Sequence, residues 1–205
     1  MTREEGYIKF KCLLVGEDFN FSKDQFLLIE NWRERFYKLN LIGAYPNGIG
    51  FGNISIRFKE GNNFIISGSA TGNYKHLKME HYALVTDFSI NENSLSYIGR
   101  VKASSESLSH AVIYETSDLI NGIIHVHSKL LWDRLIDKIP TTNQLVTYGT
   151  PEMAMELKKT LLNNKLESGG IIVMGGHEEG IISFGKDLKS AAKLLLDKRK
   201  EVLIG

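Results

Sequence analysis

The sequence predicts a single layered domain of the α+β or α/β class, with substantial antiparallel strand pairing. Short segments rich in strand-forming residues follow one another in hairpin-like succession, and four or five helical segments lie among them. The chain has 205 residues and only three prolines, and it contains no linker, internal repeat or low-complexity stretch. A length of this order favours one domain with its own hydrophobic core.

The first half of the chain begins with a predicted strand at residues 7–15, which is rich in strand formers and alternates at first. Ser22 is expected to cap a helix over residues 23–39, whose apolar side chains recur at roughly helical spacing. Residues 45–52 form a glycine-rich loop. Further short strands are predicted at residues 53–58, 63–67, 83–87 and 95–99.

The second half of the chain alternates helices and short apolar strands. Pro151 lies at the start of one helix, where proline is favoured. We divide the chain into an N-terminal extension with a predicted strand, residues 1–22, and a single domain, residues 23–205. The elements predicted in this half are helices at residues 105–116, 151–163 and 187–203, and strands at residues 122–126, 170–174 and 180–184.

The composition excludes several classes of partner. Lys and Arg number 25 against 24 Asp and Glu, and no block of like charge predicts binding to nucleic acid or to an anionic membrane. No apolar run approaches the roughly 18 to 20 residues that span a bilayer. The N-terminus is charged and lacks a signal-peptide core, and Cys12, the single cysteine, cannot form an intrachain disulfide. We therefore expect a cytoplasmic protein.

The sharpest local feature is the His-x-His pair formed by His125 and His127 in an apolar, β-branched segment. Residues two apart on a strand point to the same side, so two imidazoles would converge on one point, as a metal ion requires. A pair of hydrogen-bonded or surface histidines is the alternative. His177 follows another apolar strand, 50 positions after His127, and would complete a set of three imidazoles. Three imidazoles and an open position are typical of catalytic zinc, although such ligands also suit other divalent metals.

A second group of candidate residues stands at the start of the helix at 105–116. One interpretation is that Ser104, Ser105 and Glu106 serve only to cap this helix. The same helix start also presents free backbone N–H groups and a positive dipole end, which can bind an anion. Glu106 would then be a general base near both anion and metal. His110, four residues further on, is expected to be a packing or supporting residue rather than a ligand.

Two loops at strand ends, residues 52–57 and 68–72, supply Gly, Asn, Ser and Thr. Such loops can form backbone nests for anions, and ordinary turns have the same composition. His76 and His81 lie in a polar stretch without ligand spacing, so we interpret them as surface residues.

Taken in order, these segments resemble the class II aldolase/adducin family. The resemblance covers about residues 25 to 203. One departure is that His177 is followed by Glu178 and Glu179, where aldolases of the family more often have His-Gly. The matching segments are residues 52–57, 67–72, 103–106 with His110, 124–127, 148–151, and 176–177 with Gly180.

The resemblance implies a fold, a cofactor and an activity. The fold would be a three-layer α/β/α sandwich around a largely antiparallel sheet, and the enzyme a homotetramer. The cofactor would be Zn²⁺, or another divalent metal such as Co²⁺, Mn²⁺ or Fe²⁺. The activity would be aldolase-type cleavage of a small sugar, which we expect to be phosphorylated, and in this reaction the metal would polarise the substrate oxygens and stabilise an enediolate.

The resemblance also assigns roles to individual residues. Glu106 would be the acid/base that shuttles the proton. An epimerase, a dehydratase on the same scaffold and a non-catalytic adducin-like protein are the alternatives, and a non-phosphorylated sugar is the alternative substrate. The implied metal ligands are His125, His127 and His177, and the implied phosphate-binding residues are Asn53, Thr71, Gly72, Ser104 and Ser105.

Overall fold

The computed structural model describes residues 10–59 and 61–205, and these residues form a central sheet of eight strands. Every neighbouring pair in the sheet is antiparallel except β1 and β7, which run parallel. The predicted, largely antiparallel sheet is therefore confirmed. In their order across the sheet the strands are β1 (Lys11–Gly16), β7 (Ser94–Ile98), β6 (Tyr82–Ser89), β5 (Phe64–Ser67), β4 (Asn53–Arg57), β8 (Gly122–His127), β10 (Gly180–Gly185) and β9 (Gly169–Val173).

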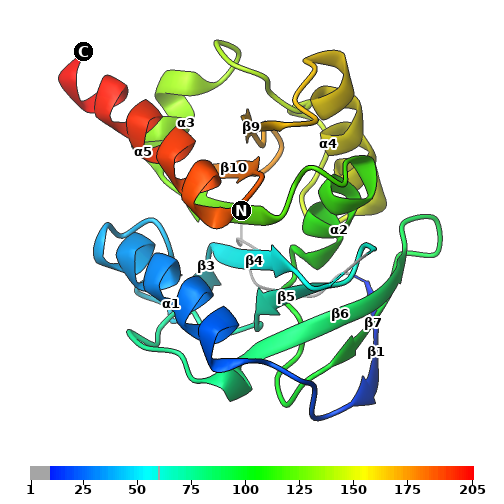
Figure 1. Cartoon of the computed structure of the whole chain (residues 1–205). Helices are drawn as coiled ribbons and strands as arrows, with labels where there is room; N and C mark the ends of the chain where they lie inside the picture. Colours follow the sequence, from blue (N-terminus) through cyan, green and yellow to red (C-terminus); the bar gives the residue numbers. More distant parts are fainter. Residues whose placement is uncertain (1–9, 60) are drawn as a thin grey trace.

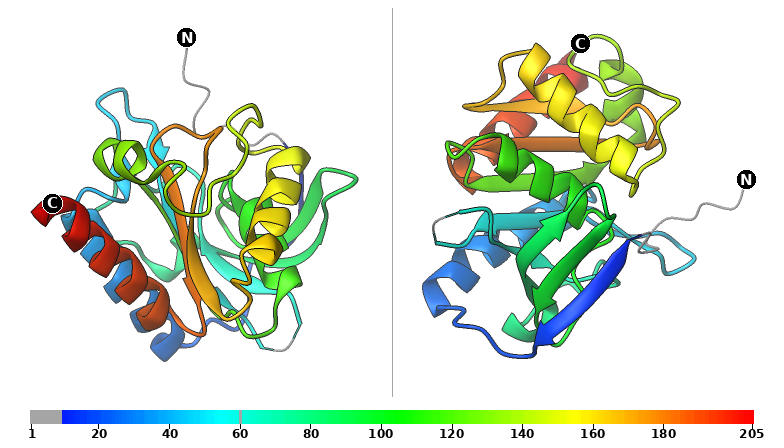
Figure 2. Two further views of the ribbon diagram at one scale, coloured as in Figure 1. Left: turned by 90° about the horizontal axis from the view of Figure 1, so that it is seen from above. Right: turned by 90° about the vertical axis from the view of Figure 1, so that its right-hand side faces the viewer.

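Helices cover both faces of the sheet, which gives the expected α/β/α layering (Figure 1). Figure 2, left, shows the red α5 and the blue α1 on one side of the sheet and the yellow α4 on the other. Helix α3 packs on the same side as α5, and α2 packs against α4. The helices are α1 (Lys23–Lys38), α2 (Ser107–Thr116), α3 (Lys129–Leu135), α4 (Pro151–Asn163) and α5 (Leu188–Ile204).

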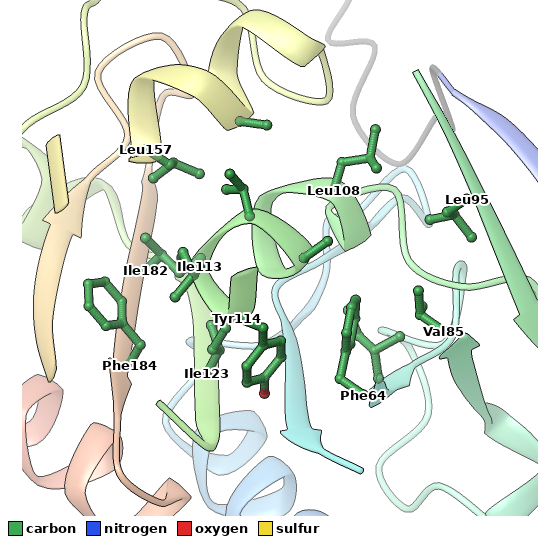
Figure 3. Packing of buried hydrophobic residues seen from close by; sticks show 14 of the residues in the cluster. Phe64, Val85, Leu95, Leu108, Ile113, Tyr114, Ile123, Leu157, Ile182 and Phe184 are labelled. Atoms are coloured by element: carbon green, nitrogen blue, oxygen red, sulfur yellow. The ribbon is translucent and has the colours of Figure 1, made fainter. Parts of the chain in front are cut away.

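Two hydrophobic cores, one on each face, hold the layers together, and strand alternation distributes residues between them. On β8, Ile123 belongs to the core under α2 and α4, whereas Ile124 and Val126 belong to the core under α1, α3 and α5. Figure 3 shows the first core, in which Phe184 and Leu157 lie on the same side of the sheet as Ile123. His125 and His127 have the parity of Ile123, so the alternation that builds the cores also turns both imidazoles to one face.

Several helix boundaries follow from predicted local signals. Ser22 accepts a hydrogen bond from the N–H of Gln25, whose side chain accepts one from the N–H of Ser22, and this capping box starts α1. Pro151 occupies the first turn of α4, and Thr150 caps it. Asp187 caps α5. No helix in the described part of the chain is both long and apolar enough to cross a membrane.

The structure differs from the predicted secondary structure in three places. The glycine-rich segment 45–52 is more than a loop, because β3 (Gly50–Phe51) pairs with β2 (Gly43–Ala44). Helix α3 was not predicted, since its seven residues are too few to show a helical period, although Ser128 caps it. The strand expected at residues 7–15 begins at Lys11 as β1, the edge strand beside β7. Residues 7–9 of that prediction lie outside the described residues.

Candidate metal centre

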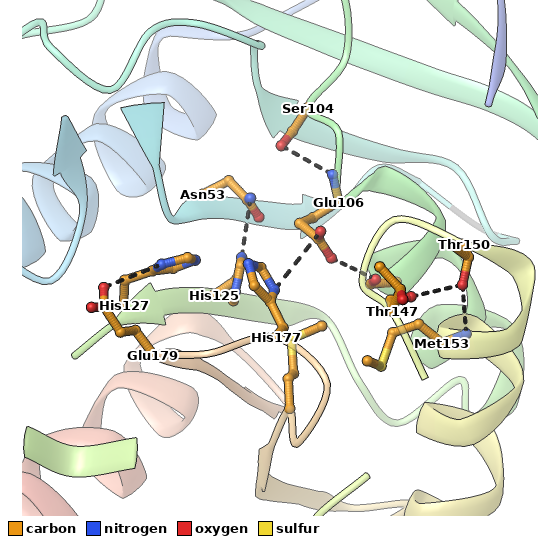
Figure 4. A network of polar contacts seen from close by, with 12 residues as sticks. Asn53, Ser104, Glu106, His125, His127, Thr147, Thr150, Met153, His177 and Glu179 are labelled. Atoms are coloured by element: carbon orange, nitrogen blue, oxygen red, sulfur yellow. Dashed lines mark hydrogen bonds and ion pairs between the residues drawn. The ribbon is translucent and has the colours of Figure 1, made fainter. Parts of the chain in front are cut away.

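The structure brings the three predicted histidines together at the end of strand β8. The ring centroids of His125 and His127 lie 4.9 Å apart, and that of His177 lies 5.1 Å from the first and 4.7 Å from the second. One ligand nitrogen of each ring lies within 4.8 Å of the other two. All three side chains are buried. Figure 4 shows His125 and His177 beside Glu106, with His127 at the other end of the cluster.

The loop between β9 and β10 carries His177, and two glycines bring it into place. A Cβ at Gly176 would lie 1.7 Å from the carbonyl oxygen of Val146, and one at Gly175 would lie 2.2 Å from that of Thr142. Neither glycine has a positive φ, but both lie in a tight turn that the N–H of His177 closes by donating to the carbonyl of Met174 at 3.0 Å, and both approach the neighbouring segment closely. The same segment carries Tyr148, whose ring stacks on His177 with centroids 4.1 Å apart.

Burial favours the neutral form of His125. It lowers the pKa of His125 well below its usual range, and the nearby His177 lowers it further. A neutral imidazole is the form that binds a metal. Nε2 of His125 is buried and has no hydrogen-bond partner among the described residues. An unpartnered buried nitrogen is costly, and a metal ion would relieve that cost.

Asn53 supports His125 from the neighbouring strand. Its side-chain nitrogen lies 3.3 Å from Nδ1 of His125, and its Oδ1 is buried without a hydrogen-bond partner in the described structure. Turned by 180°, the amide would place Oδ1 to accept from Nδ1–H, since amide oxygen and nitrogen can exchange places. In this arrangement Oδ1 of Asn53 would accept a hydrogen bond from His125, and Nε2 of His125 would be left to bind a metal.

Glu106 stands between the histidines and helix α2. It occupies the N-cap position, but its side chain makes no capping hydrogen bond; the Ser104 hydroxyl instead accepts the N–H of Glu106 at 3.4 Å, so the serine caps the helix start and the carboxylate does not. Its Oε1 lies 4.0 Å from Nδ1 of His177, and its Oε2 accepts a hydrogen bond of 2.7 Å from the Ser109 hydroxyl. No motif predicted Ser109, although its position three residues after Glu106 puts both on one face of the helix.

A single cavity is lined by every residue that the sequence assigned to the site. It adds Phe51 and Tyr148, which had no predicted role. Its lining includes serine and threonine residues and one asparagine, and no Lys or Arg is among the described residues that line it. The predicted residues in its lining are Asn53, Thr71, Gly72, Ser104, Ser105, Glu106, His125, His127 and His177.

The loop that carries Thr71 and Gly72 packs tightly on the small β2–β3 hairpin. A Cβ at Gly72 would lie 2.0 Å from the carbonyl oxygen of Gly43 and 2.8 Å from Cα of Gly50. Only glycine fits there without moving the backbone. The Thr71 hydroxyl donates to the carbonyl of Gly68, which closes the loop on itself.

Arg33 of helix α1 is hydrogen-bonded to the backbone of this loop. No sequence pattern predicted this role for Arg33. Its guanidinium donates to the carbonyl oxygens of Lys75 (2.7 Å), Thr71 (3.3 Å) and Gly72 (3.4 Å). The side chain is only 1% exposed. A planar guanidinium with five N–H donors can satisfy several carbonyls at once, which a lysine cannot do in the same way.

We expect Arg33→Met to lower the free energy of unfolding by about 2–4 kcal/mol, because it leaves buried carbonyl oxygens unpaired. Chemical denaturation followed by circular dichroism would measure the change. Arg35→Met is the matched control, because Arg35 is exposed on the same helix. Equal stability of the two variants would show that Arg33 does not hold the loop.

The remaining histidines lie outside the cluster. Nδ1 of His110 is 2.7 Å from the Ser55 hydroxyl, and burial lowers the pKa of His110 well below its usual range. This fits a supporting residue. His76 is exposed and contacts Glu34, as expected of a surface residue. His81 is half-buried and stacks on Tyr74.

Solved structures of similar fold agree with this architecture. An L-fuculose 1-phosphate aldolase is 20% identical with a TM-score of 0.66, covering 89% of this chain and 84% of its own. The L-fuculose-1-phosphate aldolase of Thermus thermophilus is 18% identical with a TM-score of 0.63, covering 87% and 91%. A sugar-phosphate aldolase of Thermotoga maritima is 14% identical with a TM-score of 0.63, covering 85% and 90%. At these identities the likeness shows the fold.

The family model described as the class II aldolase and adducin N-terminal domain matches residues 46–197. The match includes the strands that carry Asn53 and the His-x-His pair, and the loop that carries His177. It extends over well more than half of the chain. The protein therefore belongs to the class II aldolase and adducin family.

Proposed function

We propose that the protein is a metal-dependent lyase of the aldolase type, which cleaves a carbon–carbon bond in a small sugar or sugar phosphate. The observation that carries the proposal is the convergence, in one cavity, of three buried imidazoles and the carboxylate of Glu106. A protein that keeps this fold only as a scaffold has no need to bury such a group. Membership of the family supports an enzyme of this type.

His125, His127 and His177 would hold the metal. The lowered pKa of His125 and its unpartnered Nε2 fit a metal ligand, and an all-imidazole set suits Zn²⁺, with Co²⁺, Mn²⁺ or Fe²⁺ as alternatives. A divalent ion there would act as a Lewis acid that stabilises negative charge developing on the carbonyl and hydroxyl oxygens of the substrate.

Glu106 would move the proton. Its Oε2 is held by the Ser109 hydroxyl, which fixes the carboxylate on the side of His177. A carboxylate held in this way can take a proton from the substrate and return it within the same cavity. Its burial excludes bulk water from the exchange.

The polar loops would hold the rest of the substrate. Asn53, Thr71 and Gly72 line the cavity, as do Ser104 and Ser105, which precede helix α2. Hydroxyl and amide donors with a helix N-terminus fit a phosphate, and the similar structures include sugar-phosphate aldolases. No Lys or Arg is among the described residues of the lining, so a non-phosphorylated sugar is the alternative substrate.

A panel of phosphorylated and free ketoses tests the proposal. We expect the metal-loaded protein to release an aldehyde from at least one phosphorylated ketose, with a higher kcat/KM than for the free sugar. Epimers or dehydrated products without carbon–carbon cleavage would instead assign an epimerase or a dehydratase. A protein purified without chelator that contains no metal and takes up neither zinc nor cobalt at micromolar concentration would overturn the enzyme assignment.

A further inference from the structure

Three side chains at the outer end of the histidine cluster form a continuous hydrogen-bonded chain. The Tyr45 hydroxyl donates to Oε2 of Glu179 at 2.6 Å. The same hydroxyl oxygen lies 3.0 Å from Nδ1 of His127. The carboxylate itself lies 4.0 Å from that nitrogen, so the tyrosine is the link between them (Figure 4 shows His127 and Glu179).

The direction of these hydrogen bonds fixes the protonation of the His127 ring. A tyrosine has one hydroxyl hydrogen, and an ionised carboxylate can only accept. Since the hydroxyl donates to Glu179, its oxygen accepts from Nδ1–H of His127. The proton of a neutral His127 is then on Nδ1, and Nε2 carries the lone pair with which an imidazole binds a metal.

The backbone around Glu179 is arranged to put this carboxylate in place. Glu179 has φ +72°, a left-handed conformation that glycine adopts without strain and that side chains rarely adopt. Its carbonyl oxygen accepts the N–H of Ser128, directly after His127, at 2.9 Å. The strained residue is therefore tied to the strand that carries the histidine, and such strain is found where function requires it.

The position of Tyr45 is fixed by backbone hydrogen bonds and by ring packing. Its N–H donates to the carbonyl of Ile49, and its carbonyl accepts the N–H of Gly48, so the turn between β2 and β3 is closed around it. Its ring packs on Phe51 with centroids 4.6 Å apart. The hydroxyl is thus presented to His127 by a packed ring on a closed turn.

We propose that Glu179, acting through Tyr45, is a positioning residue that sets the tautomer of His127 and thereby the affinity of the metal site. The proposal rests on the metal site of the proposed function. Glu179 is not among the described residues that line the substrate cavity. We therefore expect its replacement to weaken metal binding, and to lower turnover only because less metal is bound. A histidine ligand whose second nitrogen donates to a hydrogen-bond acceptor is both oriented and made more basic.

The test is the zinc dissociation constant, measured by competition with a chelator. We expect Tyr45→Phe to weaken zinc binding by about 10–100-fold, the usual effect of removing such a partner. Glu179→Gln should weaken it less, because glutamine still accepts from the hydroxyl but without charge. The double variant should bind zinc no more weakly than Tyr45→Phe, because the carboxylate acts only through the tyrosine.

Glu178→Gln is the matched control. It is the neighbouring residue in the same loop, its side chain is 55% exposed, and it pairs with Lys129 at 3.9 Å. We expect it to leave the zinc dissociation constant unchanged. A Tyr45→Phe or Glu179→Gln protein that binds zinc as tightly as the parent, or a Glu178→Gln protein that loses as much affinity, would overturn the proposal.

The tautomer gives a readout that needs no metal. In the ¹⁵N-labelled metal-free protein we expect the ring nitrogens of His127 to report the Nδ1–H tautomer at neutral pH, and Tyr45→Phe to shift it toward Nε2–H. A His127 ring that is Nε2–H in the parent would overturn the proposal. Failure of the parent to bind zinc would instead overturn the proposed function, while the ring spectrum would still decide the role of Tyr45.

Discussion

Glu106→Gln is expected to lower kcat by about 10²–10⁴-fold, the usual contribution of a general acid–base residue. Glutamine has nearly the same shape as glutamate. Its side-chain oxygen can still accept the hydrogen bond that the Ser109 hydroxyl donates to Oε2 of Glu106 in the parent protein. It cannot carry a proton at the position that faces His177. The variant should therefore keep the fold and the metal and lose the chemistry.

The measurement is kcat on a substrate identified from the sugar panel, with metal content determined on the same preparation. Glu115→Gln is a suitable control, because Glu115 lies on the outer side of the same helix and pairs with Lys158 at 3.1 Å. We expect the control to retain parental turnover. A fully active Glu106→Gln enzyme would show that another group moves the proton.

The second large effect is expected from His125→Ala, which removes an imidazole from the cluster. A complete zinc site contributes about 10–16 kcal/mol over four ligands, so loss of one should weaken binding on the order of 10²–10³-fold. His125 lies on β8 between Asn53 of β4 and Ile182 of β10, so the backbone of the variant remains paired on both sides. Turnover should fall with the metal.

Equilibrium dialysis against zinc measures this loss directly, and thermal unfolding measures it independently. A ligand at 100 times its dissociation constant stabilises a fold by about 2.7 kcal/mol. Zinc should therefore raise the melting temperature of the parent and leave that of His125→Ala nearly unchanged. His81→Ala is the control, since His81 stacks on Tyr74 and belongs to no group of described residues that could hold a metal. If the His125→Ala protein takes up as much zinc as the parent, the metal binds at another site.

Some parts of the site were predictable because they depend on neighbours in sequence. The period of two on a strand puts His125 and His127 on one face, and the structure has them there. The capping box at Ser22 and the proline at the start of α4 are equally local. The helix start at Glu106 was predictable too, but whether its carboxylate caps the helix or faces a histidine was not.

The sequence by itself determined the strand that places two imidazoles on one face, the limits of α1, α4 and α5 to within one residue and, through the ordered motifs, the family. Only the tertiary structure decided which distant groups support them. Arg33 reaches carbonyls about 40 positions away, and Glu179 reaches Tyr45 across 134 positions. The physical reason is that periodicity reports backbone geometry over a few residues, whereas these contacts depend on the order of strands in the sheet and on the path of the loops between them.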